Sequence, residues 1–212
     1  MAITVGVDIG QVNNPTAIVC CEARSRVFIV RHIDQLPLGM SYEAVESHII
    51  DVLRALVAYL LPGELLIARI DCTGVGKPVY DHIRVLLRDH GLRQVITQGV
   101  VFLAGERPPE RRERDGLISL GKGYLVGRIN VLLSEGRIRM ADSEKAAAIR
   151  QELSNFVMRS REQASQLVVD YSAEGGARDD LVIALGLAVL YEVVDYAETV
   201  RDEPSTPRFL LR

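Results

Sequence analysis

Three strand-like segments in succession at the start of the chain constrain its fold more than any other feature. Residues 3–9, 15–22 and 26–34 are rich in Val, Ile and Cys, and only short polar breaks separate them. Connections this short join antiparallel neighbours, because two parallel strands need a crossover of about a dozen residues or more. We therefore predict that the fold begins with three consecutive antiparallel strands.

Beyond residue 40 the pattern changes to helices that alternate with strands. Ser41 is a predicted N-cap, and Glu43 places an acid in the first turn, where the helix dipole favours it. This alternation favours parallel strands, since each helix carries the chain back across the sheet. The expected elements are a helix from 41 to 62, a strand over 65–71, a helix from 74 to 90 and a strand over 95–101.

The second half of the chain continues this alternation after a polar, proline-containing loop over residues 105–116. Helical periodicity returns over residues 117–134, and the segment from about 178 to 198 predicts a last helix. Between these two helices we expect a short strand over 138–140, a helix from 143 to 156 and a strand over 166–171 that is half of a hairpin.

Length and composition agree with a single domain. The 212 residues are 48% hydrophobic and 25% charged, which is enough apolar material for one sizeable core. We predict one α/β domain over residues 3–198, in which a mixed β-sheet of three antiparallel strands plus parallel strands is flanked by helices. Residues 199–212, with two prolines, are expected to form a flexible tail.

Charge and cysteine content argue against some classes of protein. The net charge is −3, whereas a protein that binds DNA avidly by itself is usually basic. Three cysteines do not suggest a disulfide framework, and no apolar run approaches the ~18 residues that span a bilayer. We therefore expect a cytoplasmic protein with reduced cysteines and no contact with a membrane.

Four aspartates occupy positions that suit a metal site. Asp8 and Asp71 each end an apolar strand-like run, and Asp179 and Asp180 stand just before the apolar segment 181–188. Carboxylates from two strand ends and one helix start build an oxygen-only site for hard divalent cations, as used in two-metal hydrolysis of phosphodiesters. Each aspartate alone also suits a turn or a helix N-cap, but all four in this order favour a metal-dependent nuclease. Neighbouring helical residues point about 100° apart, so we expect only one of Asp179 and Asp180 to bind an ion directly.

The same residues carry a family resemblance. The order of elements and acids resembles the ribonuclease H-like nuclease fold and, within it, the nuclease domain of the large terminase subunits of tailed phages. The matching segments are Val5-Gly6-Val7-Asp8-Ile9-Gly10 with Pro15-Thr16-Ala17, Ile70-Asp71 with Gly74-Val75-Gly76, Gly121-Lys122, and residues 177–188. Two positions depart from the family pattern: Arg178 stands where His is common, and Ile183 stands where a further Asp is common.

This resemblance implies a metal-dependent endonuclease that cleaves concatemeric viral DNA during genome packaging by two-metal phosphodiester hydrolysis. It implies two Mg²⁺ or Mn²⁺ ions at Asp8, Asp71, Asp179 and Asp180, with Lys122 as a further catalytic residue. It also implies double-stranded DNA as substrate and, as partners in the host cytoplasm, an ATPase motor, a portal protein and a small terminase. No Gly-x-x-x-x-Gly-Lys-Ser/Thr phosphate loop occurs in the chain, so we expect the ATPase on another domain or subunit.

Basic residues near the matching segments are candidates for DNA contacts. Lys77 follows Gly74-Val75-Gly76 at a predicted helix start, where backbone N–H groups favour a phosphate, although an ordinary turn is the competing interpretation. Lys122 is a second candidate, and a solvated helix lysine is its alternative. The further candidates are Arg107, Arg111, Arg112 and Arg114 of the polar loop, and Arg178. Four acids balance the four arginines of the loop, so the loop has no net charge. A solvated loop without a role in DNA binding is therefore the alternative interpretation.

The sequence is also compatible with three other functions. A RuvC-type Holliday-junction resolvase, or another ribonuclease H-like nuclease, would apply the same chemistry to a different DNA. An actin-like or sugar-kinase-like ATPase also begins with Asp-x-Gly after a strand, as in Asp8-Ile9-Gly10, but needs a second similar half and glycine-rich phosphate loops. A non-catalytic docking domain of a packaging motor is the third alternative, although it has no need of the four aspartates.

Overall fold

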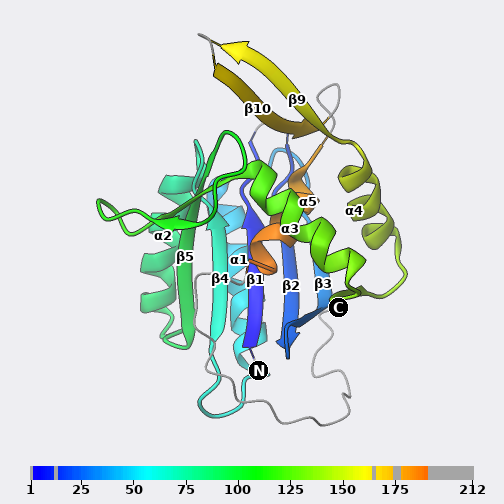
Figure 1. The fold of residues 1–212 in the computed structure, drawn as a ribbon. Coiled ribbons are helices and arrows are strands. Elements are labelled where there is room, and N and C mark those ends of the chain that lie inside the picture. Colours follow the sequence, from blue (N-terminus) through cyan, green and yellow to red (C-terminus); the bar gives the residue numbers. More distant parts are fainter. Residues whose placement is uncertain (1, 12–13, 164–165, 174–177, 191–212) are drawn as a thin grey trace.

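A mixed β-sheet forms the centre of the chain, whose computed structural model describes residues 2–11, 14–163, 166–173 and 178–190 (Figure 1). Three of its strands pair antiparallel in succession, as their short connections predict. They are β1 (Ala2–Asp8), β2 (Ala17–Arg24) and β3 (Val27–Gln35).

Parallel strands extend the sheet on both sides of this antiparallel group. On one side lie β4 (Leu66–Asp71) next to β1, then β5 (Val95–Leu103) and β7 (Ile118–Gly121). The two edges are β6 (Glu110–Arg111), antiparallel to β7, and β8 (Ile138–Met140), parallel to β3. The strand order is therefore β6-β7-β5-β4-β1-β2-β3-β8, and the predicted mixed sheet is confirmed.

Helices cover both faces of this sheet. One face packs against α1 (Tyr42–Val57) and α2 (Gly76–Asp89). The other face packs against α3 (Lys122–Ser134), α4 (Glu144–Ser154) and α5 (Asp180–Ala188) (Figure 1). A separate antiparallel hairpin follows α4 in the chain and consists of β9 (Phe156–Gln163) and β10 (Gln166–Ala173).

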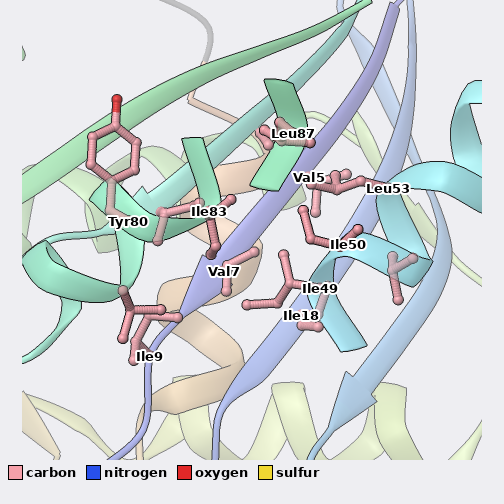
Figure 2. Packing of buried hydrophobic residues seen from close by; sticks show 14 of the residues in the cluster. Val5, Val7, Ile9, Ile18, Ile49, Ile50, Leu53, Tyr80, Ile83 and Leu87 are labelled. Atoms are coloured by element: carbon pink, nitrogen blue, oxygen red, sulfur yellow. The ribbon is translucent and has the colours of Figure 1, made fainter. Parts of the chain in front are cut away.

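Alternating side chains of β1 divide the core into two layers. Val5 and Val7 belong to the layer below α1 and α2, together with Ile49 and Ile83 (Figure 2). Gly6 faces α5 instead, and a Cβ atom at this position would lie 1.9 Å from the carbonyl oxygen of Ala184. Since only glycine permits this approach, α5 packs its backbone directly on the strand that ends at Asp8.

Residues 117–121 differ from the prediction, which assigned residues 117–134 to one helix. Ile118–Gly121 forms β7, and α3 begins only at Lys122. All residues of β7 are buried, so the strand lacks an alternating pattern, and a short apolar run of this kind resembles the start of a buried helix. The preceding polar loop also contains β6, a strand of two residues that its composition did not predict.

Two helices also end earlier than the sequence predicts. α1 ends at Val57, and the N–H groups of Tyr59 and Leu60 donate to carbonyls three residues back, so tight turns close the helix before Pro62. α5 ends at Ala188, short of the predicted end near residue 198. Residues 191–198 and the predicted tail over 199–212 lie outside the described residues.

Candidate metal centre

The parallel pairing of β1 and β4 places two carboxylates at one edge of the sheet. Val7 is in register with Ile70, so the next residues, Asp8 and Asp71, leave the sheet side by side. Asp8 is 9% exposed. Burial and then the nearby Asp71 carboxylate raise the pKa of Asp8. The ends of two neighbouring strands thus form one half of the predicted site.

The start of α5 brings the other two aspartates to the same edge. All four aspartates border an open cavity of about 150 Å³. The lining residues are Asp8, Ile9, Gln11, Asn14, Asp71, Thr73, Gly74, Asp179 and Asp180. The structure therefore brings together the four aspartates that the sequence singled out.

Asp179 occupies the N-cap position of α5 without capping the helix. In the described part of the chain its side chain accepts no bond from the α5 backbone, and its Oδ2 atom lies 2.8 Å from Lys122 Nζ. The side chains at the N-caps of α1 and α4, Ser41 and Ser143, do accept such bonds. Helix capping therefore does not explain the presence of Asp179.

Asp180 is the most deeply buried of the four carboxylates. It is 2% exposed, and its Oδ2 atom has no hydrogen-bond partner among the described residues. Burial raises the pKa of Asp180 to about 6, and the neighbouring Asp179 adds to the rise. Burying a carboxylate oxygen without a partner is unfavourable, and a bound cation would satisfy it.

Burial and mutual repulsion act on the other carboxylates as well. Burial raises the pKa of Asp8 well above its ordinary value, and the other three carboxylates of the cavity add to the rise. Burial also raises the pKa of Asp71, against the opposing effect of the Thr73 N–H group, which donates to Asp71 Oδ1 at 2.7 Å. For Lys122, burial lowers the pKa, but the neighbouring carboxylates raise it above its ordinary value. The surplus of negative charge favours a bound cation.

The donor set fits hard divalent cations. Its ligands are carboxylate oxygens, which Mg²⁺ and Mn²⁺ prefer, and one of them is the unpartnered Oδ2 atom of Asp180. Within the described ranges, no three Asp, Glu, His or Cys side chains already stand in a metal-binding arrangement. The cavity therefore offers the charge and ligand type of a metal centre.

Two of the predicted basic residues, Lys122 and Arg178, lie close enough to the carboxylates to act on the pKa of Asp180, and a third lies next to Lys122 in the fold. Lys122 contacts Asp179, and Arg178 precedes that residue in the chain with an exposed side chain. Arg107 lies in the loop before β7, and its carbonyl oxygen accepts a hydrogen bond from the N–H of Gly121 at 2.8 Å, next to Lys122. Lys122 and Arg178 thus place positive charge close to the carboxylates.

The other basic candidates lie in different settings. Arg112 and Arg114 are 3.0 and 3.7 Å from the same oxygen of Asp115 in their own loop. Arg111 belongs to β6 and is exposed. Lys77 forms an ion pair with Asp81 one turn along α2, and neither residue lines the cavity among the described residues. The structure therefore does not bring these residues to the carboxylates.

The glycine-rich segment before Lys77 is explained by a tight turn. A Cβ atom on Gly76 would lie 1.9 Å from the carbonyl oxygen of Asp71, so the start of α2 folds back onto the end of β4. Thr73 within this turn holds the Asp71 carboxylate through its N–H group. The segment thus positions Asp71, while the predicted DNA contact of Lys77 stays a prediction.

Glu152 is a residue of this region that the sequence did not indicate. It lies on α4, is 9% exposed, and its Oε2 atom accepts the N–H groups of Leu181 and Val182 at 2.9 and 3.1 Å. Burial raises the pKa of Glu152 to about 7. No spacing or motif connects it with the aspartates, because α4 and α5 meet only in the tertiary structure. Gln11, Asn14 and Thr73 line the cavity and were also not singled out.

Solved structures with a similar fold include nuclease domains of terminases. The large terminase nuclease from thermophilic phage G20c is 16% identical over 88% of this chain and 80% of its own, with a TM-score of 0.55. The human cytomegalovirus terminase nuclease domain, soaked with Mn, is 14% identical over 87% of this chain and 80% of its own, also with a TM-score of 0.55. The large terminase from a second thermophilic bacteriophage is 14% identical over 89% of this chain and 39% of its own, with a TM-score of 0.53.

At these identities the similarity establishes the fold, which is the ribonuclease H-like nuclease fold predicted from the sequence. No protein-family model and no curated protein matches the chain. None of the helices in the described ranges is long and apolar enough to cross a bilayer.

Proposed function

We propose that this chain is a metal-dependent DNA endonuclease of the terminase type that acts on concatemeric viral DNA during genome packaging. The observation that supports this most strongly is the convergence of Asp8, Asp71, Asp179 and Asp180 on one cavity. Lys122 and the unpartnered oxygen of Asp180 add to it. The fold is that of terminase nuclease domains, and a Mn-soaked structure of one of them supports the use of divalent cations.

The proposed site would hold two Mg²⁺ or Mn²⁺ ions. Asp8, whose pKa is raised by burial and by all three other carboxylates, and Asp71 would hold the ions from the ends of β1 and β4. Asp180 would bind through its unpartnered Oδ2 atom, and Asp179 would position Lys122, which it contacts at 2.8 Å. When bound, such ions supply an activated water and neutralise charge on the leaving oxygen of a phosphodiester.

Lys122 has two proposed roles that need no ion. Its ammonium group balances part of the repulsion among the carboxylates, and it holds Asp179 away from the α5 backbone. We further propose that it contacts a phosphate of the substrate, so that its charge stabilises the additional negative charge of the transition state.

Double-stranded DNA is the proposed substrate, and an ATPase motor is the proposed partner, together with a portal protein and a small terminase. The chain spans 39% of the large terminase from the second thermophilic bacteriophage, which was also solved in complex with ATP-gamma-S. This supports an ATPase outside the nuclease domain, for which we propose residues 3–198. The net charge of −3 agrees with a nuclease to which a motor delivers the DNA.

Cleavage of supercoiled plasmid tests this function. We expect nicking and linearisation with Mn²⁺ or Mg²⁺, none with EDTA, and none with Asp71→Asn, which keeps the size of the side chain and removes its charge. Asp51→Asn is the matched control, because Asp51 is an exposed aspartate of α1 that forms an ion pair with Arg54 and does not line the cavity in the described structure. A wild-type protein that neither cuts DNA nor binds Mn²⁺ in electron paramagnetic resonance titrations would contradict the proposal.

A further inference from the structure

Buried charges from two other elements contact the two ends of α5, the helix that begins at the acidic pair. At its start, Glu152 of α4 accepts hydrogen bonds from Leu181 N–H and Val182 N–H at 2.9 and 3.1 Å. At its end, Arg69 of β4 donates from Nη1 to the carbonyl oxygen of Leu187 at 3.2 Å. A helix is positive at its N-terminus and negative at its C-terminus, so both charges have the stabilising sign.

Glu152 takes over the role that an N-cap side chain has in other helices. The first N–H groups of a helix lack partners within it, and Ser41 and Ser143 provide such partners for α1 and α4. Asp179 does not do this for α5, because its carboxylate contacts Lys122. A cap supplied by another helix therefore leaves the side chains of Asp179 and Asp180 available to the cavity.

We propose that Glu152 is a positioning residue of the metal centre, which fixes the start of α5 so that Asp180 and Asp179 meet Asp8 and Asp71. This inference rests on the proposed function. The described residues that line the cavity do not include Glu152, so it acts through the α5 backbone and not as an ion ligand. Because Glu152 lies in the last turn of α4, which ends at Ser154, it also links α5 to the end of α4.

Three variants separate positioning from stability alone. Glu152→Ala removes the acceptor of both hydrogen bonds, and Glu152→Gln keeps an acceptor oxygen at nearly the same place. Ser41→Ala is the matched control, since it removes the bond from Ala44 N–H to Ser41 Oγ, 3.3 Å long, on the opposite face of the sheet. If Glu152→Ala does not fold, Glu152→Asp, which withdraws the carboxylate by one methylene group, replaces it.

The readouts are amide hydrogen exchange at Leu181 and Val182 in the metal-free protein, and Mn²⁺ affinity by electron paramagnetic resonance. In Glu152→Ala we expect faster exchange of both amides and a Mn²⁺ dissociation constant at least about tenfold higher than that of the wild type. Glu152→Gln should stay close to the wild type in both measurements. Ser41→Ala should lower the melting temperature without a change in Mn²⁺ affinity.

Two results would overturn the inference. The first is an unchanged Mn²⁺ affinity in folded Glu152→Ala, or in Glu152→Asp where that variant replaces it. The second is an equal loss of affinity in Glu152→Gln with the exchange protection retained, because the charge of Glu152 and not its cap would then serve the ions. A wild-type protein that binds no Mn²⁺ contradicts the proposed function itself and is thereby distinguished from both results.

Discussion

Lys122 Nζ and Asp179 Oδ2 lie 2.8 Å apart, although 57 positions separate the two residues in the chain. Lys122 begins α3 directly after β7, and Asp179 directly precedes α5. The contact therefore joins two helix starts at the sheet edge where the parallel strands end. It also places one ammonium group among four carboxylates. Burial raises the pKa values of Asp8, Asp71 and Asp180, and the charge of Lys122 opposes this rise.

Replacing Lys122 by alanine should move metal binding to higher pH. Without the ammonium group the carboxylates ionise less readily, and they must ionise to bind an ion. We expect the pH midpoint of Mn²⁺ binding to rise by on the order of one unit, while the affinity above about pH 8 is not weaker, because a repelling charge is gone. Electron paramagnetic resonance titrations over pH measure this.

The control for this prediction is Lys77→Ala, which removes a lysine that pairs with Asp81 on α2. Its Mn²⁺ binding should follow the wild-type pH profile. An unchanged midpoint in Lys122→Ala would show that the ammonium group does not govern the charge of the site.

The metal-free protein should lose stability as the pH rises from about 4 to about 7. The folded pKa of Asp180 is about 6, above its ordinary value of 3.8, and Glu152 shifts in the same direction, to about 7 from 4.5. A raised folded pKa contributes stability that is complete below the unfolded pKa and is lost as the pH rises through the folded pKa. This contribution therefore falls between about pH 4 and pH 7, and thermal unfolding in EDTA should show it.

Asp180→Asn identifies the group responsible. The neutral amide cannot ionise, so between about pH 5 and 7.5 the melting temperature of this variant should fall less than that of the wild type. The difference should be about 2–4 °C for each kcal/mol by which ionisation of Asp180 lowers the free energy of unfolding. Mn²⁺ should raise the wild-type melting temperature at about pH 7.5, because it binds the folded state alone. If the variant and the wild type show the same slope with pH, Asp180 is not the buried acid that limits stability.

Arg107 should contribute to DNA binding more than the other loop arginines. The carbonyl oxygen of Arg107 accepts a hydrogen bond from the N–H of Gly121, next to Lys122. The Arg114 side chain, in contrast, is 81% exposed and lies 3.7 Å from Asp115. We expect Arg107→Ala to weaken binding to all duplex sequences alike and to reduce the salt slope by about one, as for loss of one phosphate contact. Fluorescence anisotropy in Asp71→Asn over a salt series measures this.

Arg114→Ala is the matched control for charge, since it removes one arginine from the same loop. Its affinity and salt slope should stay close to those of the parent protein. Equal losses in the two arginine variants would mean that the loop contributes only its overall charge.

Much of the fold follows from local sequence patterns. The breaks between β1, β2 and β3 are too short for anything but antiparallel pairing, and Ser41 caps its helix as predicted. The prediction was wrong where local patterns coincide, as in β7, whose four buried residues match the start of a helix as well as a strand.

The sequence likewise predicts one part of the candidate site and not the other. The sequence by itself determined which carboxylates end strands, because an acid after an apolar run is a local feature, and Asp8 and Asp71 needed only the parallel pairing of their strands. Only the tertiary structure decided that Lys122 contacts Asp179, that Glu152 caps α5 and that Asp180 is buried. These relationships join residues from α3, α4 and α5, whose side chains meet only after the helices pack on one face of the sheet. Contacts of this kind depend on packing geometry, which no spacing along the chain records.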